Sequence, residues 1–104
     1  MNKYRDKSDF EINKAVAVNI NGSDAVVEKF GRIYISDSDA MVSFDPCNNP
    51  YDAMPIIIEN GISMIKSSGG WMCCHGAAGV IEHEKLYRAA MICFLMMKDA
   101  ENEK

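Results

Sequence analysis

The sequence predicts an α+β fold, in which a small antiparallel sheet of hairpins packs against a long C-terminal helix, with an N-terminal helix and a short middle helix. Three observations predict this class. Apolar residues recur at helical spacing over about residues 84–99, Gly-containing turns separate short β-rich runs, and a capping sequence near the N-terminus begins another helix. The length of 104 residues, 48% of them hydrophobic, suits one domain over residues 1–104 with an ordered core at about 8–99.

The N-terminal helix is predicted at about Asp9–Asn19. Ser8 and Glu11 have the spacing of a capping box, in which each side chain accepts a hydrogen bond from the backbone amide of the other residue. Apolar residues then follow on one helical face, namely Ile12, Ala15, Val16 and Ile20. Asn21-Gly22 is expected to end the helix.

The first β-region is predicted over residues 25–44. The runs Ala25–Phe30 and Arg32–Ser36 are rich in strand-forming residues, and Gly31 between them indicates a bulge or a bend. A turn at Asp37–Asp39 precedes the alternating segment Met41–Phe44, which predicts a hairpin with the acidic turn near its tip.

A second hairpin is predicted between Ile62–Ser67 and Trp71–His75, because the glycines of the intervening Ser68–Gly70 supply positive φ. Residues 76–79 are expected to form a loop of small residues. The closing helix is predicted at about Glu84–Asp99, and its apolar arc is so wide that it lies centrally in the core or is partly covered by another subunit. Residues Ala100–Lys104 are expected to fray.

The middle of the chain is the least determined part. Asp45–Pro50 contains two prolines and three Asx residues and therefore forms a turn-rich loop, after which Asn49 and Pro50 suit the cap and first position of a helix. Pro55 predicts a break or kink in that helix. Asn60-Gly61 between two Ile-rich runs is also a strong hairpin signal, so the residues alone leave helix-then-strand and hairpin open for residues 55–65.

Composition and charge limit the classes of function that the chain can have. A net charge of −4 argues against direct binding of the nucleic-acid backbone, and no apolar run is long enough to cross a membrane. All charges between Ile33 and Ile65 are acidic, which indicates a solvated face, contact with a basic partner, or mimicry of a phosphate backbone. Eleven Ile and eight Met accompany only two Leu, which fits an ordinary core or, alternatively, a Met-lined binding surface.

The four cysteines suggest reduced thiols in a cytosolic protein. No pair has the C-x-x-C spacing, and the N-terminal residues lack the apolar region of a secretory signal. The spacing of Cys73, Cys74, His75 and His83 does not match a zinc site, so we expect no metal and no cofactor. An enzyme hypothesis pairs Cys47 with His75, with Asp45 orienting the imidazole, for acyl-transfer chemistry through a thiolate.

The proline-braced loop is the main candidate for recognition. It concentrates polar side chains, although Asx residues that cap the next helix produce the same pattern. Trp71 is a candidate ligand-stacking residue or an anchor in the core or in a dimer interface. The candidate recognition surface comprises Asp45, Asn48, Asn49, Asp52, Trp71, His75 and Arg88.

Residues 8–17, 44–57 and 86–97, in that order and with Gly70-Trp71 between the last two, resemble the NinX-like family of lambdoid phages and enterobacterial prophages. The resemblance implies a phage or prophage accessory protein that acts in the bacterial cytoplasm, and it implies no established activity. It also favours a helix across Pro55–Asn60, with Gly61 as its left-handed stop.

We therefore expect a non-enzymatic protein-interaction module that self-associates, for example as a homodimer. We also expect it to contact a host or phage protein whose identity the sequence does not give. A cysteine-dependent hydrolase or transferase that uses Cys47 and His75 is one alternative. An acidic nucleic-acid mimic is the other.

Overall fold

The computed structural model describes residues 3–76 and 78–102, and its helices and strands confirm the α+β class. In chain order the elements are α1 (Asp9–Asn21), the 3-10 helix η1 (Ser23–Ala25), β1 (Val26–Lys29), β2 (Arg32–Asp37), β3 (Ala40–Ser43), α2 (Pro50–Asn60), β4 (Ser63–Ser67), β5 (Gly70–His75), β6 (Gly79–His83) and α3 (Leu86–Asn102).

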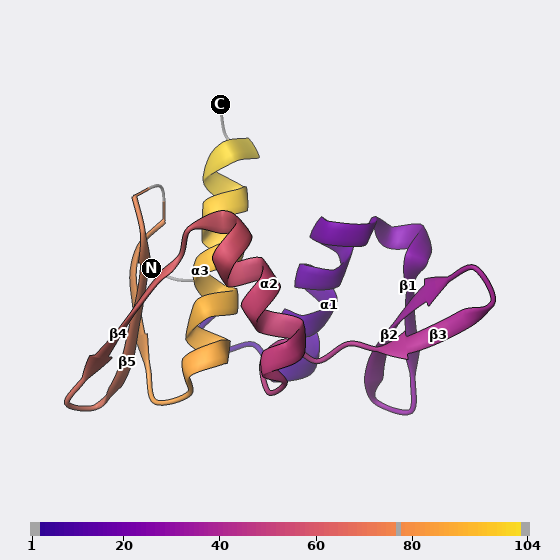
Figure 1. The fold of residues 1–104 in the computed structure, drawn as a ribbon, viewed down its shortest axis with the longest axis horizontal. Helices are drawn as coiled ribbons and strands as arrows, with labels where there is room; N and C mark the ends of the chain where they lie inside the picture. Colours follow the sequence, from indigo (N-terminus) through magenta and orange to yellow (C-terminus); the bar gives the residue numbers. More distant parts are fainter. Residues whose placement is uncertain (1–2, 77, 103–104) are drawn as a thin grey trace.

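The hairpins divide into two separate antiparallel sheets, β1-β2-β3 and β4-β5-β6. The long helix α3 lies in the middle of the molecule, with the β4-β5-β6 sheet against one side and α1 and α2 against the other (Figure 1). The β1-β2-β3 sheet packs on α1 and lies at the opposite end of the molecule from the second sheet (Figure 1). The chain thus forms successive layers around α3.

The turn between β1 and β2 differs from the expected bulge or bend. Lys29 pairs directly with Arg32, so the chain reverses through the two residues Phe30 and Gly31. Both have positive φ, 54° at Phe30 and 71° at Gly31, as a type I′ hairpin turn requires. The glycine that interrupted the β-pattern therefore marks a tight reversal.

The helix predicted before Gly61 is present as α2, and the hairpin alternative for residues 55–65 is wrong. Asn49 caps it by accepting the Tyr51 amide, and Gly61 ends it in the left-handed conformation at φ 65°. The expected break at Pro55 is not observed, because α2 continues to Asn60. Pro55 lies on the exposed side of the helix, where water can satisfy the carbonyl that its missing N–H leaves unpaired.

Other boundaries differ from those predicted. Strand β6 was not anticipated and pairs with β5, with Ile81 opposite Cys73. The last helix begins at Leu86 and continues to Asn102, so the fraying expected from Ala100 is wrong for residues 100–102. Residues 103–104, and residue 77 of the predicted 76–79 loop, lie outside the described residues.

The core is built around α3, which confirms the central position that its wide apolar arc allowed. Its buried residues are Arg88, Ala89, Ala90, Met91, Ile92, Cys93, Phe94, Leu95 and Met97. The segment before α1 also contributes, because buried Tyr4 donates from its hydroxyl to Asp99 at 2.6 Å. Burial and this hydrogen bond raise the pKa of Tyr4. In the described parts of the chain, no helix combines the length and apolarity that crossing a bilayer requires.

Candidate functional site

A connected set of polar side chains joins α1, the Asp45–Asn49 loop, α2 and α3. We call it the polar cluster; its members are Asp9, Asn13, Asp45, Asn48, Asp52, Lys85 and Arg88. Arg88 on α3 is 7% exposed and donates to Asp9 at 2.6 Å. Its guanidinium also donates to the backbone carbonyls of Arg5 and Lys7, so the N-terminal segment is held against α3.

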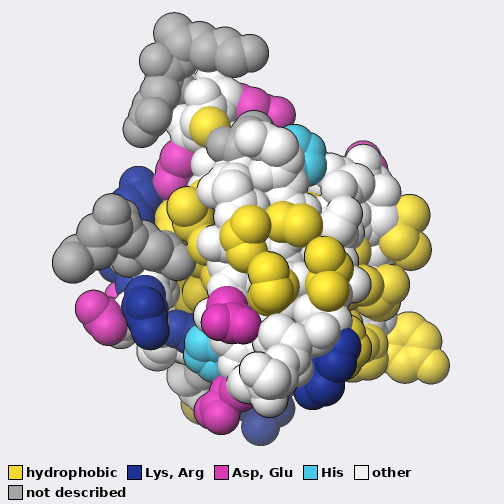
Figure 2. Space-filling model, turned by 90° about the vertical axis from the view of Figure 1, so that its left-hand side faces the viewer, with side chains coloured by type: hydrophobic (Ala, Val, Ile, Leu, Met, Phe, Trp, Pro, Cys, Tyr) yellow, Lys and Arg dark blue, Asp and Glu magenta, His cyan; other side chains and the backbone are white. Residues whose placement is uncertain are grey.

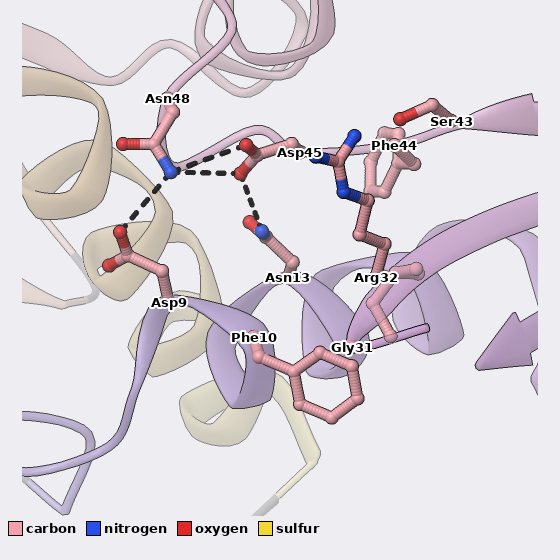
Figure 3. A pocket seen from close by; sticks show the side chains of 10 residues that line it. Asp9, Phe10, Asn13, Gly31, Arg32, Ser43, Phe44, Asp45 and Asn48 are labelled. Atoms are coloured by element: carbon pink, nitrogen blue, oxygen red, sulfur yellow. Dashed lines mark hydrogen bonds between the residues drawn. The ribbon is translucent and has the colours of Figure 1, made fainter. Parts of the chain in front are cut away.

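Asp45 fixes the loop to the two helices that flank it. Its carboxylate accepts from the Asn13 amide nitrogen at 2.6 Å and from Asn48 at 3.1 Å (Figure 3). Its own backbone N–H donates to Asp52 on α2 at 2.9 Å. The Asn13 carbonyl in turn accepts the Cys47 amide at 3.0 Å, so both ends of the Asn13 side chain are used.

Asp9 carries the strongest electrostatic effect in the polar cluster. Partial burial raises its pKa, but hydrogen bonds from Lys85, Arg88 and Asn48 outweigh that effect and lower it to about 2. The Lys85 ammonium lies 2.7 Å from the Asp9 carboxylate. Asp9 is therefore ionised at neutral pH and balances the buried Arg88 charge.

A pocket of about 350 Å³ opens beside the polar cluster, between α1 and the β2–β3 strands. Figure 3 shows the side chains that line it, namely Asp9, Phe10, Asn13, Gly31, Arg32, Ile33, Ser43, Phe44, Asp45 and Asn48. Arg32 forms no ion pair within residues 3–76 and 78–102. The lining contains hydrogen-bonding groups but neither His nor Cys, so it suits recognition better than nucleophilic chemistry.

The structure brings together only part of the predicted recognition surface. Asp45, Asn48, Asp52 and Arg88 all belong to the polar cluster. Asn49 instead caps α2, accepting the Tyr51 amide at 3.0 Å. The loop carboxylates and amides are thus largely engaged in holding helices together.

Trp71 and His75 lie on β5, in the second sheet. The Lys66 ammonium is 5.2 Å from the centre of the Trp71 ring. His75 lines a separate depression together with Cys74 and Gly61. Neither residue lines the pocket beside the polar cluster.

Cys47 has the environment of a structural thiol. It is buried, and its Sγ lies 3.9 Å from the Asp9 carbonyl oxygen, to which it donates. Burial, followed by the negative charge of Asp9, raises the pKa of the Cys47 thiol to about 12. His75 lies on β5 in the second sheet, where it lines a depression that does not include Cys47. The geometry therefore gives a Cys47–His75 nucleophilic pair no support.

Two further thiols, those of Cys73 and Cys93, are also buried. Burial, with smaller effects from neighbouring cysteines, raises the pKa of Cys73 to about 12 and that of Cys93 to about 11. In the described segments, no group of three or more His, Cys, Asp or Glu side chains is placed to hold a metal ion.

A second feature of the surface is apolar and lies on α2. We call it the α2 face, and it consists of Pro50, Tyr51, Met54, Pro55 and Ile58. These five residues line a groove of about 350 Å³. Tyr51 is 88% exposed and Ile58 is 71% exposed, so the described chain leaves both uncovered.

The opposite side of α2 forms part of the core. Ala53, Ile56 and Ile57 are buried there. Two carboxylates, Asp52 and Glu59, lie beside Tyr51 and Pro55 in an adjoining pocket that Lys98 also lines. Asp52 accepts the Asp45 backbone N–H, and neither carboxylate forms an ion pair within the described residues. The α2 face is therefore an apolar groove with an acidic edge.

Another apolar patch lies on the outer face of the second sheet. Figure 2 shows hydrophobic side chains grouped in the middle of that face. The strand register places Ile65, Met72, Cys74 and Val80 on one side of the sheet, opposite the buried Cys73 and Ile81. Met72 and Cys74 are half-buried, whereas Ile65 and Val80 are 50% and 58% exposed.

Comparison with known families gives the origin of the chain. A family model described as "Bacteriophage P22, NinX" matches residues 3–98. The chain belongs to this phage NinX family. The match confirms the resemblance seen in the sequence, and it spans the polar cluster, the α2 face and both sheets. No match to a curated protein or to a solved structure was found.

The sequence analysis missed the exposed apolar side of α2 in this NinX-family chain. Tyr51 is followed by Met54 and Pro55 three and four residues later, and Ile58 follows these at the same spacing, so α2 is apolar on two faces. The described residues leave one of these faces exposed. That spacing was visible once a helix was chosen for residues 50–60. The hydrogen bonds of Asp9 and Asn13 in the polar cluster could not be predicted from neighbouring residues, because their partners lie far away in the sequence.

Proposed function

We propose that this NinX-family chain is a non-enzymatic protein-interaction module of a phage accessory protein, acting in the cytoplasm of a bacterial host. We further propose that the α2 face binds a segment of another protein chain. The observation that carries the proposal is the pair of large apolar side chains, Tyr51 and Ile58, that are 88% and 71% exposed beside an apolar groove.

The exposure of these side chains is energetically meaningful. Fully burying a side chain of this size contributes about 1.5–3 kcal/mol. A contact that covers Tyr51 and Ile58 together with Met54 therefore has a substantial apolar driving force. Aromatic residues are also the ones most often found as anchors in protein interfaces.

The chemistry of the groove favours a protein segment over a small molecule. Small-molecule sites place a few polar groups to orient the ligand. The α2 groove is lined by two prolines, a methionine, an isoleucine and a tyrosine, and it offers almost no such groups. Helical anchors at this spacing are typical of surfaces that contact another chain.

The charge of the edge defines the kind of segment. Asp52 and Glu59 lie at one side of the groove, and no Lys or Arg occurs between Ile33 and Ile65. A segment with an apolar or aromatic side chain next to basic residues complements both properties. The partner is thus expected to present a basic, apolar segment.

Site-specific photocrosslinking tests the proposal. A benzophenone amino acid is placed at position 58 in bacteria that express the chain during phage infection, and adducts are identified by mass spectrometry. We expect a discrete adduct with a phage or host protein or with a second copy. Binding of the identified protein is then measured with purified components, where Tyr51→Lys is expected to weaken it at least about tenfold.

The matched control places the same crosslinker at Val42 on β3, which is apolar and 57% exposed but lies outside the α2 face. Position 42 should give no such adduct. The same adduct from both positions, or no loss of affinity with Tyr51→Lys, would show that the α2 face is not a docking surface.

A further inference from the structure

We propose that the segment received by the α2 face is the β1–β2 turn of a second copy of this chain, so that copies associate head to tail. This inference rests on the proposed function, because it names the occupant of the same groove. It joins two exposed features of one chain, the β1–β2 turn and the α2 face.

The β1–β2 turn presents an aromatic side chain to solvent. Phe30 is 86% exposed and has nothing in the described chain to cover it except the Lys29 side chain, whose ammonium is 5.6 Å from the ring centre. The turn lies at the end of the molecule formed by the first sheet (Figure 1). Phe30 is therefore free to enter a groove on another molecule.

The backbone at Phe30 makes this residue unusual. Its φ of 54° lies in the left-handed region, where glycine, asparagine or aspartate is favoured in the first position of a type I′ turn. A bulky residue there carries a conformational cost. Exposing an aromatic ring to water and holding its backbone in the left-handed region are both unfavourable for the isolated chain. We therefore infer that Phe30 is used in binding.

The charges around the turn complement those around the groove. Lys29 precedes the turn and Arg32, whose side chain lines the pocket beside the polar cluster, follows it. Neither forms an ion pair within the described residues. The groove has an apolar lining with Asp52 and Glu59 at its edge. The turn is thus a basic, aromatic segment of the kind that the α2 face selects, and a groove of about 350 Å³ accommodates one aromatic side chain.

Every copy carries one turn and one groove, so the contact is heterologous. Such contacts produce a closed ring if the rotation between copies closes and an open chain if it does not. In either case each interface uses Phe30 from one molecule and Tyr51 and Ile58 from the next. A two-fold pairing of two α2 faces would instead bring the acidic edges together.

Mixing two complementary variants tests this arrangement. Phe30→Asn removes the ring and suits the turn backbone, whereas Ile58→Glu places a charge in the groove. Sedimentation velocity of the purified wild-type chain should show assemblies above the 11.6 kDa monomer. Each variant alone should associate at least about tenfold more weakly, while an equimolar mixture should form a 1:1 dimer and nothing larger, because only one intact interface remains.

Val80→Glu, on the outer face of the second sheet, is the matched control and should associate like the wild type. Circular dichroism confirms that each variant is folded. A wild-type chain that is monomeric at millimolar concentration would overturn the inference. So would association that Val80→Glu abolishes and Phe30→Asn does not, or a mixture that fails to restore the dimer.

The outcomes also separate this inference from the proposed function. A purified monomer whose position 58 still crosslinks specifically to a different protein would remove only the head-to-tail contact. Loss of every specific crosslink at position 58, with the purified chain remaining monomeric, would remove both.

Discussion

The polar cluster and the α2 face are opposite in character, although the loop of the polar cluster leads directly into α2. In the polar cluster, Asp9, Asp45 and Arg88 all have hydrogen-bonding partners contributed by the chain itself. On the α2 face, Tyr51 and Ile58 are large, apolar and uncovered. The polar groups of the first region are hydrogen-bonded within the chain, whereas the apolar side chains of the second are exposed to solvent.

This difference changes which residues are considered functional. Carboxylates, amides and an arginine grouped around a loop are typical of a binding site, yet here most of their hydrogen bonds connect α1, α2 and α3 to the loop. The apolar residues of the α2 face, which the sequence analysis did not single out, are the ones available to a partner. Availability, not residue type, distinguishes the two regions.

The largest expected effect is a difference in stability between variants on the two sides of α2. Ile57 is 2% exposed and packs in the core, so Ile57→Ala should lower the free energy of unfolding by about 3.5 kcal/mol. Ile58→Ala, one residue further along, should change it by less than about 0.5 kcal/mol. Urea denaturation of both variants measures this contrast. Equal losses would mean that Ile58 is also buried and that the α2 face is not a free surface.

Breaking the polar cluster should be nearly as damaging. Asp9→Asn leaves the buried Arg88 guanidinium without its carboxylate and should cost about 3 kcal/mol of unfolding free energy. Glu28→Gln removes a partner from the exposed Lys14–Glu28 pair at 3.1 Å and should cost less than about 1 kcal/mol. Chemical denaturation compares the two variants. A similar small loss from both would show that the cluster contributes little to stability.

The same cluster should make stability depend on pH in the acid range. The pKa of Asp9 is lowered in the folded chain from 3.8 to about 2, so its contribution is present above about pH 4 and is lost as the pH falls through 2. At about 1.4 kcal/mol per pKa unit, and allowing for partial exposure, this amounts to about 2 kcal/mol. Chemical denaturation at several pH values gives the free energy of unfolding, which should fall less steeply between pH 6 and about pH 2 for Asp9→Asn than for the wild type. Parallel pH profiles would contradict the assignment.

Local patterns predicted the elements well wherever the deciding interactions are close in sequence. The Ser8–Glu11 capping box is present, with the Glu11 amide donating to the Ser8 hydroxyl at 3.1 Å. Asn49 caps α2 and Gly61 ends it, as their residue types indicated. Each of these features depends on contacts within a few residues, which a sequence pattern records directly.

The candidate site was predicted only in part, because its geometry depends on contacts between distant residues. Arg88 meets Asp9 across 79 positions, and Asn13 meets Asp45 across 32, so no spacing rule connects them. Trp71 and His75 were grouped with the loop on residue type alone, and the fold places them in another sheet. The exposure of Tyr51 and Phe30 likewise depends on which elements cover them, which a periodic pattern does not specify.

The smallest predicted effect gives the sharpest test of the comparison, because it has the opposite sign for stability and for association. Phe30→Asn replaces a strained, exposed aromatic residue with one that tolerates φ near 54°, and it should raise the free energy of unfolding by about 1 kcal/mol. The same change should weaken self-association, since it removes the ring proposed to enter the α2 face. Thermal unfolding at low protein concentration gives the stability, and sedimentation at high concentration gives the association. A variant that is more stable and still associates normally would show that Phe30 takes no part in binding. We expect instead that the variant gains stability and loses association, as for a residue that serves binding at some cost to the stability of the fold.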